Sequence, residues 1–453
     1  MNIVVMGLGY VGLVTAACLA ELGHDVTGID IDSNRIHLLK EGQMPIYEPG
    51  LRELVSKNNI EGRLNFSNSL DENLDKALLI FLAVGTPSDD NGTPDLSAVY
   101  KSIDSLIPFI KSHKVFVVKS TVPIGTNAEI KKYLTKKLKT DFDIVSNPEF
   151  LKEGTAVQDF MKPDRIVIGT DNIKVSEIMK ELYIHLTRNG HPILVMDPVS
   201  AETVKYASNL MLALKVSFIN EIAMICDVIG ADIRRVREGI ISDPRIGAQF
   251  LYPSIGYGGS CLPKDVQAVN HLCKEKSINA LIPRAVLESN DRQSNWFISK
   301  ISSWFDKEDI KNKTIAIWGT SFKAGTDDVR ESPALRVIEG LLKLNVKLRL
   351  YDPIALKNTK KCFADSKFAN NIYYATSEMD SVKGTNALIV CTEWLQFRNP
   401  NFERLASELK DKVIFDGRNL YDPEKLKLFG LSHVGIGIPV SKVKQNSELR
   451  AQS

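Results

Sequence analysis

The sequence has little charge imbalance, few cysteines and no long apolar run. Its 453 residues contain 57 lysines and arginines against 55 aspartates and glutamates, a formal net charge of +2. A dedicated nucleic-acid-binding protein usually carries a concentrated basic excess, so we expect no nucleic-acid partner. The lysines of 131–139 lie between Glu129 and Asp141 and are typical of a solvated helix face.

The six cysteines are scattered, and none belongs to a CxxC pair. This spacing argues against a zinc ribbon and a thioredoxin motif, and we predict no metal site. A disulfide scaffold is not expected in a chain of this length, so we predict reduced thiols and a cytoplasmic location.

No stretch of about 18 uninterrupted apolar residues exists, so we predict no transmembrane helix and no membrane partner. The apolar N-terminal segment 3–20 has no basic region before it and is interrupted by three glycines, which is unlike a signal peptide. At roughly 150 residues per domain, the length indicates two or three domains.

Short β-branched runs alternate with helical patterns in the first half of the chain. Continuous apolar strands separated by helices imply a parallel sheet covered on both faces. The predicted strands are Ile3–Met6, Val26–Ile29, Leu78–Val84, Val115–Val118, Ile144–Val145, Ile166–Ile168 and Ile193–Met196.

A long helix is predicted from Ala201 to Ile229, with Pro198 in its first turn and Gly230 as its stop. A helix that is apolar nearly all round is buried, either as a spine between domains or at a subunit interface. The apolar residues concerned are Leu210, Met211, Leu212, Leu214, Val216, Phe218, Ile219, Ile222, Met224 and Ile225.

A second α/β pattern follows, and it shows no repeat of the first half at the residue level. Its strands are Thr314–Trp318, Lys347–Tyr351, Ala387–Cys391 and Val413–Phe415, with a helix over Ala334–Leu344. The expected fold is α/β, with two Rossmann-like doubly wound domains joined by a long central helix. The domain ranges are 1–200, 201–310 and 311–440, followed by a polar, frayed tail over 441–453.

Gly7, Gly9 and Gly12 form a GxGxxG motif that follows a strand and opens a helix, and Asp30 closes the next strand. This context is the dinucleotide-binding fingerprint, in which glycines admit a pyrophosphate and the acidic residue binds a ribose. Asp30 favours NAD over NADP, whereas Arg35 is close enough in sequence to host a 2′-phosphate. The alternative is a glycine-rich turn without a ligand.

Three further loops follow strands, at the sheet edge where open α/β proteins bind ligands. They are Gly85–Pro87, Ser120–Thr126 and Asn147–Gly154. Ordinary turn chemistry or a solvated loop explains each of them equally well when taken alone.

Lys205 and Asn209 are spaced i, i+4 and share one face of the long apolar helix. Buried there, they need polar partners; the alternative for Lys205 is an ammonium that reaches solvent.

The segment Gly256–Asp265 (GYGGSCLPKD) combines glycines with a cysteine, a lysine and an aspartate. Cys261 stands at a predicted helix start with Lys264 close behind, and both features favour a nucleophilic thiolate. Asp265 adds a possible base. The other five cysteines lie in apolar patterns or, for Cys362, in a loop, and we interpret them as structural.

In the C-terminal half, Gly319–Lys323 follows a strand where a second phosphate loop would lie. Ser332 and Pro333 fit the N-cap and first position of the next helix. Lys323, Arg330 and Arg418 could together neutralise phosphates, although each alone is also consistent with a surface charge.

Together these segments resemble the UDP-glucose 6-dehydrogenase family of nucleotide-sugar dehydrogenases, from Met1 to about Gly437. The most specific segments are GLGYVG at 7–12, STVPIGT at 120–126, NPEFLKEGTAVQDFMKPDRIVIG at 147–169, GYGGSCLPKD at 256–265 and FKAGTDDVRESPA at 322–334. Relatives acting on GDP-mannose share GGSCLPKD, while Glu153-Gly154 and Pro163–Ile166 look more like the UDP-glucose branch.

The resemblance implies an NAD-binding domain over 1–200, a central helical linker and dimerisation domain over 201–310 and a UDP-sugar-binding domain over 311–440. The implied NAD contacts are Gly7, Gly9, Tyr10, Val11, Gly12, Asp30, Arg35, Thr86, Thr121, Glu153, Lys264 and Arg330. The implied UDP-glucose contacts are Glu149, Phe150, Leu151, Lys205, Asn209, Phe250, Leu251, Tyr252, Ser254, Gly258, Lys323 and Arg418. Arg245, in the stretch Asp243–Gly247, would reach the substrate of a neighbouring subunit in a homodimer built on the long helix.

The implied reaction is the four-electron oxidation of UDP-glucose at C6 to UDP-glucuronate with two NAD, a step in nucleotide-sugar and polysaccharide biosynthesis. Cys261 would form a thiohemiacetal and then a thioester, and Lys205 and Asn209 would stabilise the oxyanion. Asp265, Thr121 and Glu149 would surround an ordered water. The alternatives are the same chemistry on GDP-mannose or a UDP-amino sugar, and a non-catalytic NAD-binding scaffold.

Overall fold

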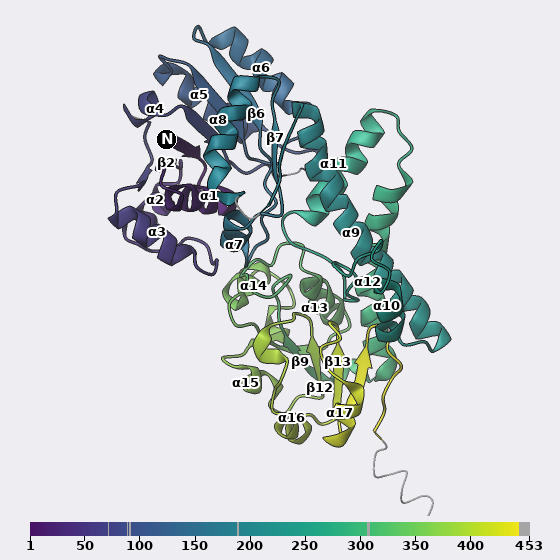
Figure 1. Cartoon of the computed structure of the whole chain (residues 1–453). Helices are drawn as coiled ribbons and strands as arrows, with labels where there is room; N and C mark the ends of the chain where they lie inside the picture. Colours follow the sequence, from purple (N-terminus) through teal and green to yellow (C-terminus); the bar gives the residue numbers. More distant parts are fainter. Residues whose placement is uncertain (71, 88, 90–91, 188–189, 306–308, 444–453) are drawn as a thin grey trace, which may run out of the picture. The chain divides into compact units, whose positions relative to one another are not determined.

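The computed structural model describes residues 1–70, 72–87, 89, 92–187, 190–305 and 309–443. The chain divides into two compact units, Met1–Ser208 and Asn209–Ser453, and each contains one sheet with its helices (Figure 1). The predicted α/β class with two Rossmann-like sheets and a long central helix is confirmed.

The first unit contains an eight-stranded sheet in the order β3-β2-β1-β4-β5-β6-β7-β8. The strands are β1 Asn2–Met6, β2 Asp25–Ile29, β3 Leu64–Ser67, β4 Leu79–Leu82, β5 Lys114–Val118, β6 Phe142–Ser146, β7 Ile166–Gly169 and β8 Ile193–Met196. The helices are α1 Tyr10–Glu21, α2 Ser33–Lys40, α3 Leu51–Ile60, α4 Glu72–Lys76, α5 Ser97–Leu106, α6 Thr126–Lys137, α7 Ala156–Met161 and α8 Ile173–Tyr183. All neighbouring strands pair in parallel except β6 and β7, which meet in a single antiparallel pair.

The second unit contains a six-stranded parallel sheet in the order β11-β10-β9-β12-β13-β14. The strands are β9 Thr314–Trp318, β10 Lys347–Tyr351, β11 Ile372–Tyr374, β12 Ala387–Val390, β13 Val413–Asp416 and β14 Ser432–Gly435. The helices are α10 Ile233–Ile241, α11 Leu262–Glu275, α12 Leu281–Trp304, α13 Pro333–Lys343, α14 Leu356–Cys362, α15 Glu378–Val382, α16 Phe402–Glu408 and α17 Pro423–Leu428. Ser332 caps α13 through the N–H of Ala334, as its sequence position predicts.

Both sheets bury their two faces, which explains why their strands are continuously apolar. In β1, Ile3 and Val5 pack into one hydrophobic core, and Val4 and Met6 pack into the core on the opposite face. In β9, the isoleucines 315 and 317 alternate in the same way with Ala316 and Trp318.

The two units share the strand order 3-2-1-4-5-6 that characterises dinucleotide-binding folds, and the likeness extends to single residues. Gly7 and Gly319 each follow the first strand with φ +88°. Asp30 and Asp352 each follow the second strand, and their carboxylates accept N–H groups from the loop after the first. The equivalent residues are few and lie within different motifs, so they form no repeat in the sequence itself.

Helix α9 covers Pro198–Ile229, so it begins in the first unit and continues in the second. Within a single chain α9 is not buried all round, which leaves open the expected alternative of a subunit interface. Met211, Phe218 and Ile225 are 56%, 48% and 48% exposed, and of the ten apolar residues named above only Ile219 is fully buried. One apolar stripe of α9 therefore faces outward in the single chain.

The C-terminal end departs from the expected frayed tail at its first residue. Ser441 is buried and exchanges two backbone hydrogen bonds with His433 of β14, at 2.8 and 3.0 Å. Residues 444–453 of the predicted tail lie outside the described residues. None of the helices in the described part of the chain combines the length and apolar character that a bilayer crossing requires.

We expect Asp352→Ala to destabilise the second unit. The buried carboxylate accepts the backbone N–H groups of Thr320, Ser321, Ile354 and Ala355 and the indole N–H of Trp394. Leaving several buried donors unpaired should lower the free energy of unfolding by about 3 kcal/mol and one calorimetric transition by roughly 10 °C. The exposed Asp365→Ala is the control, and an unmoved transition in Asp352→Ala would contradict this role.

Candidate active site

The glycine motif after β1 forms an open turn at the start of α1. Gly7 has φ +88°, and a Cβ there would lie 2.8 Å from Cγ1 of Val84. A Cβ at Gly12 would collide with the carbonyl oxygen of Gly7, so this glycine allows the turn and α1 to pack together. Gly9 meets no protein atom within 4 Å of a built Cβ. Among the described residues, none fills the space beside Gly9, which is thus available to a ligand.

Asp30 lies at the end of β2, buried, where the fingerprint places a ribose-binding carboxylate. Its Oδ2 accepts the Leu8 N–H at 2.7 Å and Nη1 of Arg35 at 2.8 Å. Burial alone would raise the pKa of Asp30, but hydrogen bonds from Asp32, Leu8 and Arg35 outweigh it and lower the pKa. The carboxylate therefore stays ionised, and Arg35 neutralises it.

These features fit NAD. The N-cap of α1 is Gly9, no side chain of the described residues caps it and no acidic residue occupies its first turn. Such an uncapped helix N-terminus offers its N–H groups to a pyrophosphate. By contrast, Asp32 caps the next helix, α2, by accepting the N–H groups of Asn34 and Arg35.

Thr86 and Thr121 follow the neighbouring strands β4 and β5 and are in contact. The Thr86 hydroxyl donates to the Thr121 carbonyl at 2.7 Å, and the Ser120 hydroxyl donates to the Val84 carbonyl at 2.6 Å. The two predicted loops therefore form one edge of the first sheet.

Glu202 of α9 holds the far end of the Thr121 loop. Its buried carboxylate accepts the Gly125 N–H at 2.6 Å and the Asn127 N–H at 2.9 Å, at the start of α6. Burial raises the pKa of Glu202. The sequence pattern does not indicate this residue, because a glutamate in a long helix carries no local signal of burial.

Glu149 and Lys205 form a buried ion pair, which explains how an ammonium is accommodated on an apolar helix. Lys205 Nζ lies 2.7 Å from Oε1 of Glu149 and 2.8 Å from its carbonyl oxygen. Burial opposes ionisation of Glu149, but Lys205 and the Leu151 N–H stabilise the carboxylate and lower its pKa. The interpretation of Lys205 as a solvent-reaching side chain is wrong.

Phe150 and Leu151 continue from this pair toward the surface of the first unit. The guanidinium of Arg165 stacks 3.8 Å from the centre of the Phe150 ring, and the ammonium of Lys205 lies 5.7 Å from the same ring. The segment that resembles a substrate contact is thus held by two cations.

A buried hydrogen-bond network near Glu149 was not predicted from the sequence. It consists of Lys119, Asn147 and Tyr183. Asn147 Oδ1 accepts from Lys119 Nζ at 3.1 Å and from the Tyr183 hydroxyl at 2.6 Å. Burial lowers the pKa of Lys119 to about 8, against the opposing effect of Glu149. A charged residue directly after the apolar strand β5 was the available signal.

Cys261 is the N-cap residue of α11, at the helix start that its sequence context predicts. Its carbonyl accepts the N–H of Asp265, so Asp265 lies one helical turn further on. Asp265 is buried, accepts Nδ2 of Asn209 at 2.6 Å and lies 2.9 Å from Nζ of Lys264. The structure thus assembles four of the predicted residues within the second unit.

The remaining cysteines differ more than expected. Cys18, Cys226 and Cys391 are buried, and burial raises the pKa of the Cys391 thiol to about 12. Cys273 is half-buried. Cys362 is the last residue of helix α14 and is exposed, so the expectation that Cys362 lies in a loop and is a structural thiol is wrong. All six lie among the described residues and none is joined in a disulfide.

The glycine loop before Cys261 packs on the loop after β9. A Cβ at Gly258 would collide with the carbonyl of Glu331, and one at Gly259 would lie 2.8 Å from the Phe322 ring. Glycine is required at both positions because of this close approach. It brings the Cys261 segment beside the predicted second phosphate loop, which carries the half-buried Lys323.

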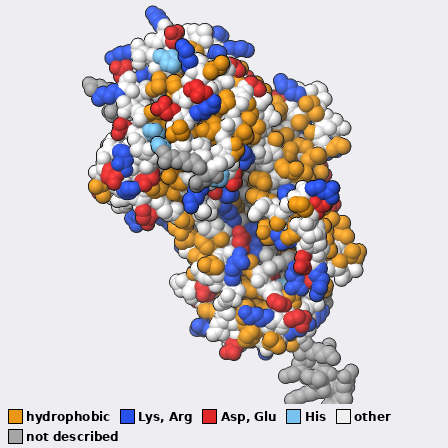
Figure 2. Space-filling model, in the orientation of Figure 1, with side chains coloured by type: hydrophobic (Ala, Val, Ile, Leu, Met, Phe, Trp, Pro, Cys, Tyr) orange, Lys and Arg blue, Asp and Glu red, His pale blue; other side chains and the backbone are white. Residues whose placement is uncertain are grey.

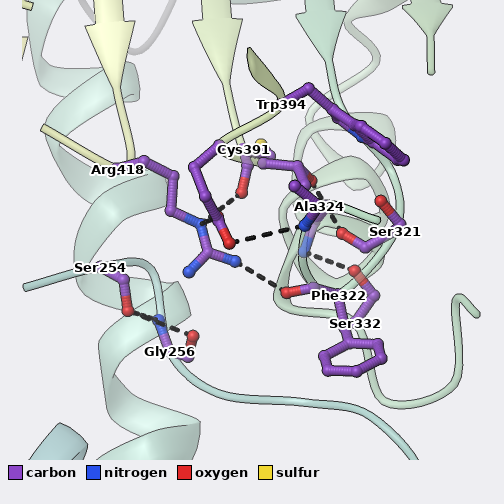
Figure 3. Close-up of polar contacts among 12 residues, drawn as sticks. Ser254, Gly256, Ser321, Phe322, Ala324, Ser332, Cys391, Trp394 and Arg418 are labelled. Atoms are coloured by element: carbon purple, nitrogen blue, oxygen red, sulfur yellow. Dashed lines mark hydrogen bonds and ion pairs between the residues drawn. The ribbon is translucent and has the colours of Figure 1, made fainter. Parts of the chain in front are cut away.

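Arg418 lies at the same edge of the second sheet, at the carboxyl end of β13 (Figure 3). Its Nε donates to the Cys391 carbonyl at 2.8 Å, its Nη2 donates to the Phe322 carbonyl at 2.8 Å, and Glu393 lies 3.1 Å from Nε. The guanidinium is thereby fixed beside the loop that follows β9.

The Phe250–Ser254 segment is also ordered by hydrogen bonds. Asn220 of α9 accepts the Ser254 N–H at 2.8 Å, and Gln293 donates to the Ser254 carbonyl at 2.7 Å. Leu251 is buried while Tyr252 is exposed, and Phe250 has φ +65°.

Arg330 and Arg245 lie at more exposed positions. Arg330 forms a bidentate pair with Asp328. Arg245 does the same with Asp243, and its side chain is 88% exposed. Arg330 is therefore already paired with a carboxylate, whereas the sequence suggested that it neutralises phosphates together with Lys323 and Arg418.

Three family models match consecutive parts of the chain. They are described as the NAD binding, central and UDP binding domains of the UDP-glucose/GDP-mannose dehydrogenase family and match residues 1–187, 199–292 and 316–423. A curated UDP-glucose 6-dehydrogenase of Pseudomonas aeruginosa is 40% identical over 444 residues, which cover 97% of this chain and 98% of that protein.

Solved structures are similar as well. A UDP-glucose dehydrogenase from the archaeon Pyrobaculum islandicum is 33% identical, with a TM-score of 0.87 over 96% of this chain and 97% of that chain. A UDP-D-ManNAc dehydrogenase from Pyrococcus horikoshii is 27% identical, with a TM-score of 0.83 over 96% of this chain and 99% of that chain.

The network around Lys119 predicts a pH-dependent contribution to stability. An unfolded lysine keeps its proton up to about pH 10.4. In the folded chain Lys119 has a pKa of about 8, so it loses its proton at a lower pH than in the unfolded chain. The free energy of unfolding should therefore rise with pH between these values, by about 3 kcal/mol relative to Lys119→Met. Chemical unfolding of both proteins at a series of pH values measures this difference, with the exposed Lys111→Met as control. A difference independent of pH would contradict the assignment.

Proposed function

This chain belongs to the UDP-glucose/GDP-mannose dehydrogenase family, and we propose that it oxidises UDP-glucose at C6, in two NAD-dependent steps, to UDP-glucuronate. It is an NAD-dependent oxidoreductase with a nucleotide-sugar substrate. The observation that carries the proposal is Cys261 at the start of α11, one turn before the buried Asp265, beside the phosphate loop of the second sheet.

In this proposal each domain has a separate role. Residues 1–200 bind NAD, residues 201–310 link the domains and form the dimer, and residues 311–440 bind the UDP sugar. The NAD contacts are Gly7, Gly9, Tyr10, Val11, Gly12, Asp30, Arg35, Thr86, Thr121, Glu153, Lys264 and Arg330. The UDP-glucose contacts are Glu149, Phe150, Leu151, Lys205, Asn209, Phe250, Leu251, Tyr252, Ser254, Gly258, Lys323 and Arg418, with Arg245 from a neighbouring subunit.

NAD, when bound, accepts a hydride from C6 in each of the two steps. In the first step the C6 hydroxyl also gives up its proton to an ordered water held by Asp265, Thr121 and Glu149, which leaves an aldehyde. The Glu149–Lys205 pair keeps Glu149 ionised, as an acceptor needs to be.

Cys261 then forms a bond from sulfur to the aldehyde carbon, and the carbonyl oxygen takes up the proton to give a thiohemiacetal. Loss of the second hydride and of that proton restores the carbonyl as a thioester. Water adds to the thioester carbon, the carbon–sulfur bond breaks, and the thiol and the carboxylate leave. Lys205 and Asn209 stabilise the oxyanions of these steps, an interaction worth roughly 3–4 kcal/mol per donor.

The first test counts NADH per sugar. With purified protein, NAD and UDP-glucose, absorbance at the NADH band should report two NADH for each UDP-glucuronate. One NADH per sugar, or turnover of GDP-mannose or a UDP-amino sugar without turnover of UDP-glucose, would contradict the proposal. An absence of turnover on all of these would favour a non-catalytic scaffold.

Cys261→Ser should stop the reaction after its first stage, since the variant has no thiolate to capture the aldehyde. The steady-state rate should fall at least about a thousandfold, while one NADH per active site still forms in a single turnover. Cys362→Ser, which removes an exposed thiol, is the matched control and should keep full activity. Sustained turnover by Cys261→Ser would eliminate the thioester step.

The exposed stripe of α9 supports a homodimer as part of the proposal. Met211, Phe218 and Ile225 recur every seven residues, a spacing typical of helix-on-helix packing. Figure 2 shows hydrophobic side chains gathered over the region where Figure 1 draws α9, α11 and α12. The exposed Arg245 is then available to a neighbouring subunit.

Phe218→Glu should convert this dimer to a monomer, because a charge would be buried at the centre of the stripe. Light scattering coupled to gel filtration measures the mass. Asn295→Glu adds the same charge at an exposed position of α12 and should remain dimeric. A wild-type mass of one chain, or an unchanged mass in Phe218→Glu, would exclude this interface.

We also propose a cytoplasmic location, because the nucleophilic Cys261 and the five other cysteines require reducing surroundings.

A further inference from the structure

Glu48 lies in the segment between α2 and α3, far in sequence from the loops that the fingerprint identifies. Its side chain is nevertheless buried, with 6% of the residue exposed. A carboxyl group buried in such a position requires hydrogen-bond partners. The donors that it meets belong to two separate parts of the NAD site.

The first part is the start of α1. Tyr10 is the first residue of α1, directly after Gly9, and its hydroxyl donates a hydrogen bond to Oε2 of Glu48. The same hydroxyl accepts the Gly154 N–H at 3.1 Å. The Tyr10 hydroxyl is therefore used within the protein, and what remains of Tyr10 for a ligand is its ring and backbone.

The second part is the segment that carries Glu153. Oε2 of Glu48 accepts the Gly154 N–H at 2.6 Å, and Oε1 accepts the Ala156 N–H at 2.8 Å. Gly154 has φ +84°, a conformation that glycine adopts readily. The two hydrogen bonds fix the segment on both sides of this turn.

We propose that Glu48 is a positioning residue of the NAD site. It ties the first turn of α1 to the Glu153–Gly154 turn and so holds two parts of the cofactor site at a fixed separation. This inference rests on the NAD contacts proposed above for Tyr10 and Glu153. Because Glu48 acts through these residues and not on the reacting atoms, its loss should weaken binding of the cofactor and leave the chemical steps nearly unchanged.

The experiment measures NADH binding to the full chain by NADH fluorescence, without any sugar. Glu48→Ala should raise the Kd for NADH about tenfold. Glu48→Gln should have a smaller effect than Glu48→Ala, because its amide oxygen still accepts one of the two backbone N–H groups while its NH2 group cannot accept the other. Tyr10→Phe, which keeps the carboxylate and both backbone hydrogen bonds, should raise the Kd about threefold. In turnover assays, KM for NAD should rise by similar factors with kcat within about twofold of wild type.

Glu53→Ala, at an exposed position of α3, is the matched control and should bind NADH as wild type does. Thermal unfolding reports whether each variant folds; if Glu48→Ala does not, Tyr10→Phe and Glu48→Gln carry the test. An unchanged Kd for NADH in the folded variants, or a loss of kcat with KM for NAD unchanged, would overturn the proposal. Since NADH binding needs no substrate, a failure of the proposed UDP-glucose oxidation would leave this result readable.

Discussion

A buried carboxylate at the end of the second strand organises each sheet of this protein. Asp30 and Asp352 both accept N–H groups from the loop that follows the first strand. In both units this loop bends through a glycine with φ +88°, and the N–H group that follows the glycine donates to the carboxylate. The loop at this edge of each sheet is thus held by one carboxylate placed at the same point of the same topology.

The surroundings of the two carboxylates nonetheless differ. Asp30 is paired with Arg35 and lies beside an uncapped helix N-terminus, an arrangement suited to a dinucleotide. Asp352 is saturated by protein donors, and the cation of that edge, Arg418, comes from the end of β13 instead. We propose that the first carboxylate also binds ligand hydroxyls, whereas the second is a structural acceptor.

Buried charge is a second common feature. Lys119, Glu149 and Lys205 are all buried in the first unit, and both ammonium groups favour the ionised form of the Glu149 carboxylate. Removing such groups from water is unfavourable unless they are paired and hydrogen-bonded, and perturbed titration concentrates where proteins carry out chemistry. Asn147 accepts hydrogen bonds from Lys119 and Tyr183, while Lys205 and the Leu151 N–H hold the carboxylate of Glu149.

Much of this could be predicted from local patterns, because apolar periodicity and glycine spacing encode strands, helices and the turns between them. The seven strands predicted in the first half and the four in the second are all present, as are Ser332 at its N-cap and Cys261 at the start of its helix. Strands β3, β11 and β14 were missed because they are short and contain polar residues such as Asn65 and His433.

The family, the cofactor class and the candidate nucleophile therefore follow from the order of residues along the chain, since each depends on a contiguous motif. The partners of buried groups do not, because they come from segments far apart in sequence. Glu48 meets Gly154 from 106 residues away, and Glu202 meets Gly125 from 77. Hydrogen bonds and burial at such separations form only when the tertiary structure brings the segments together. The exposed stripe of α9 and the pairing of Ser441 with β14 likewise depend on the tertiary structure.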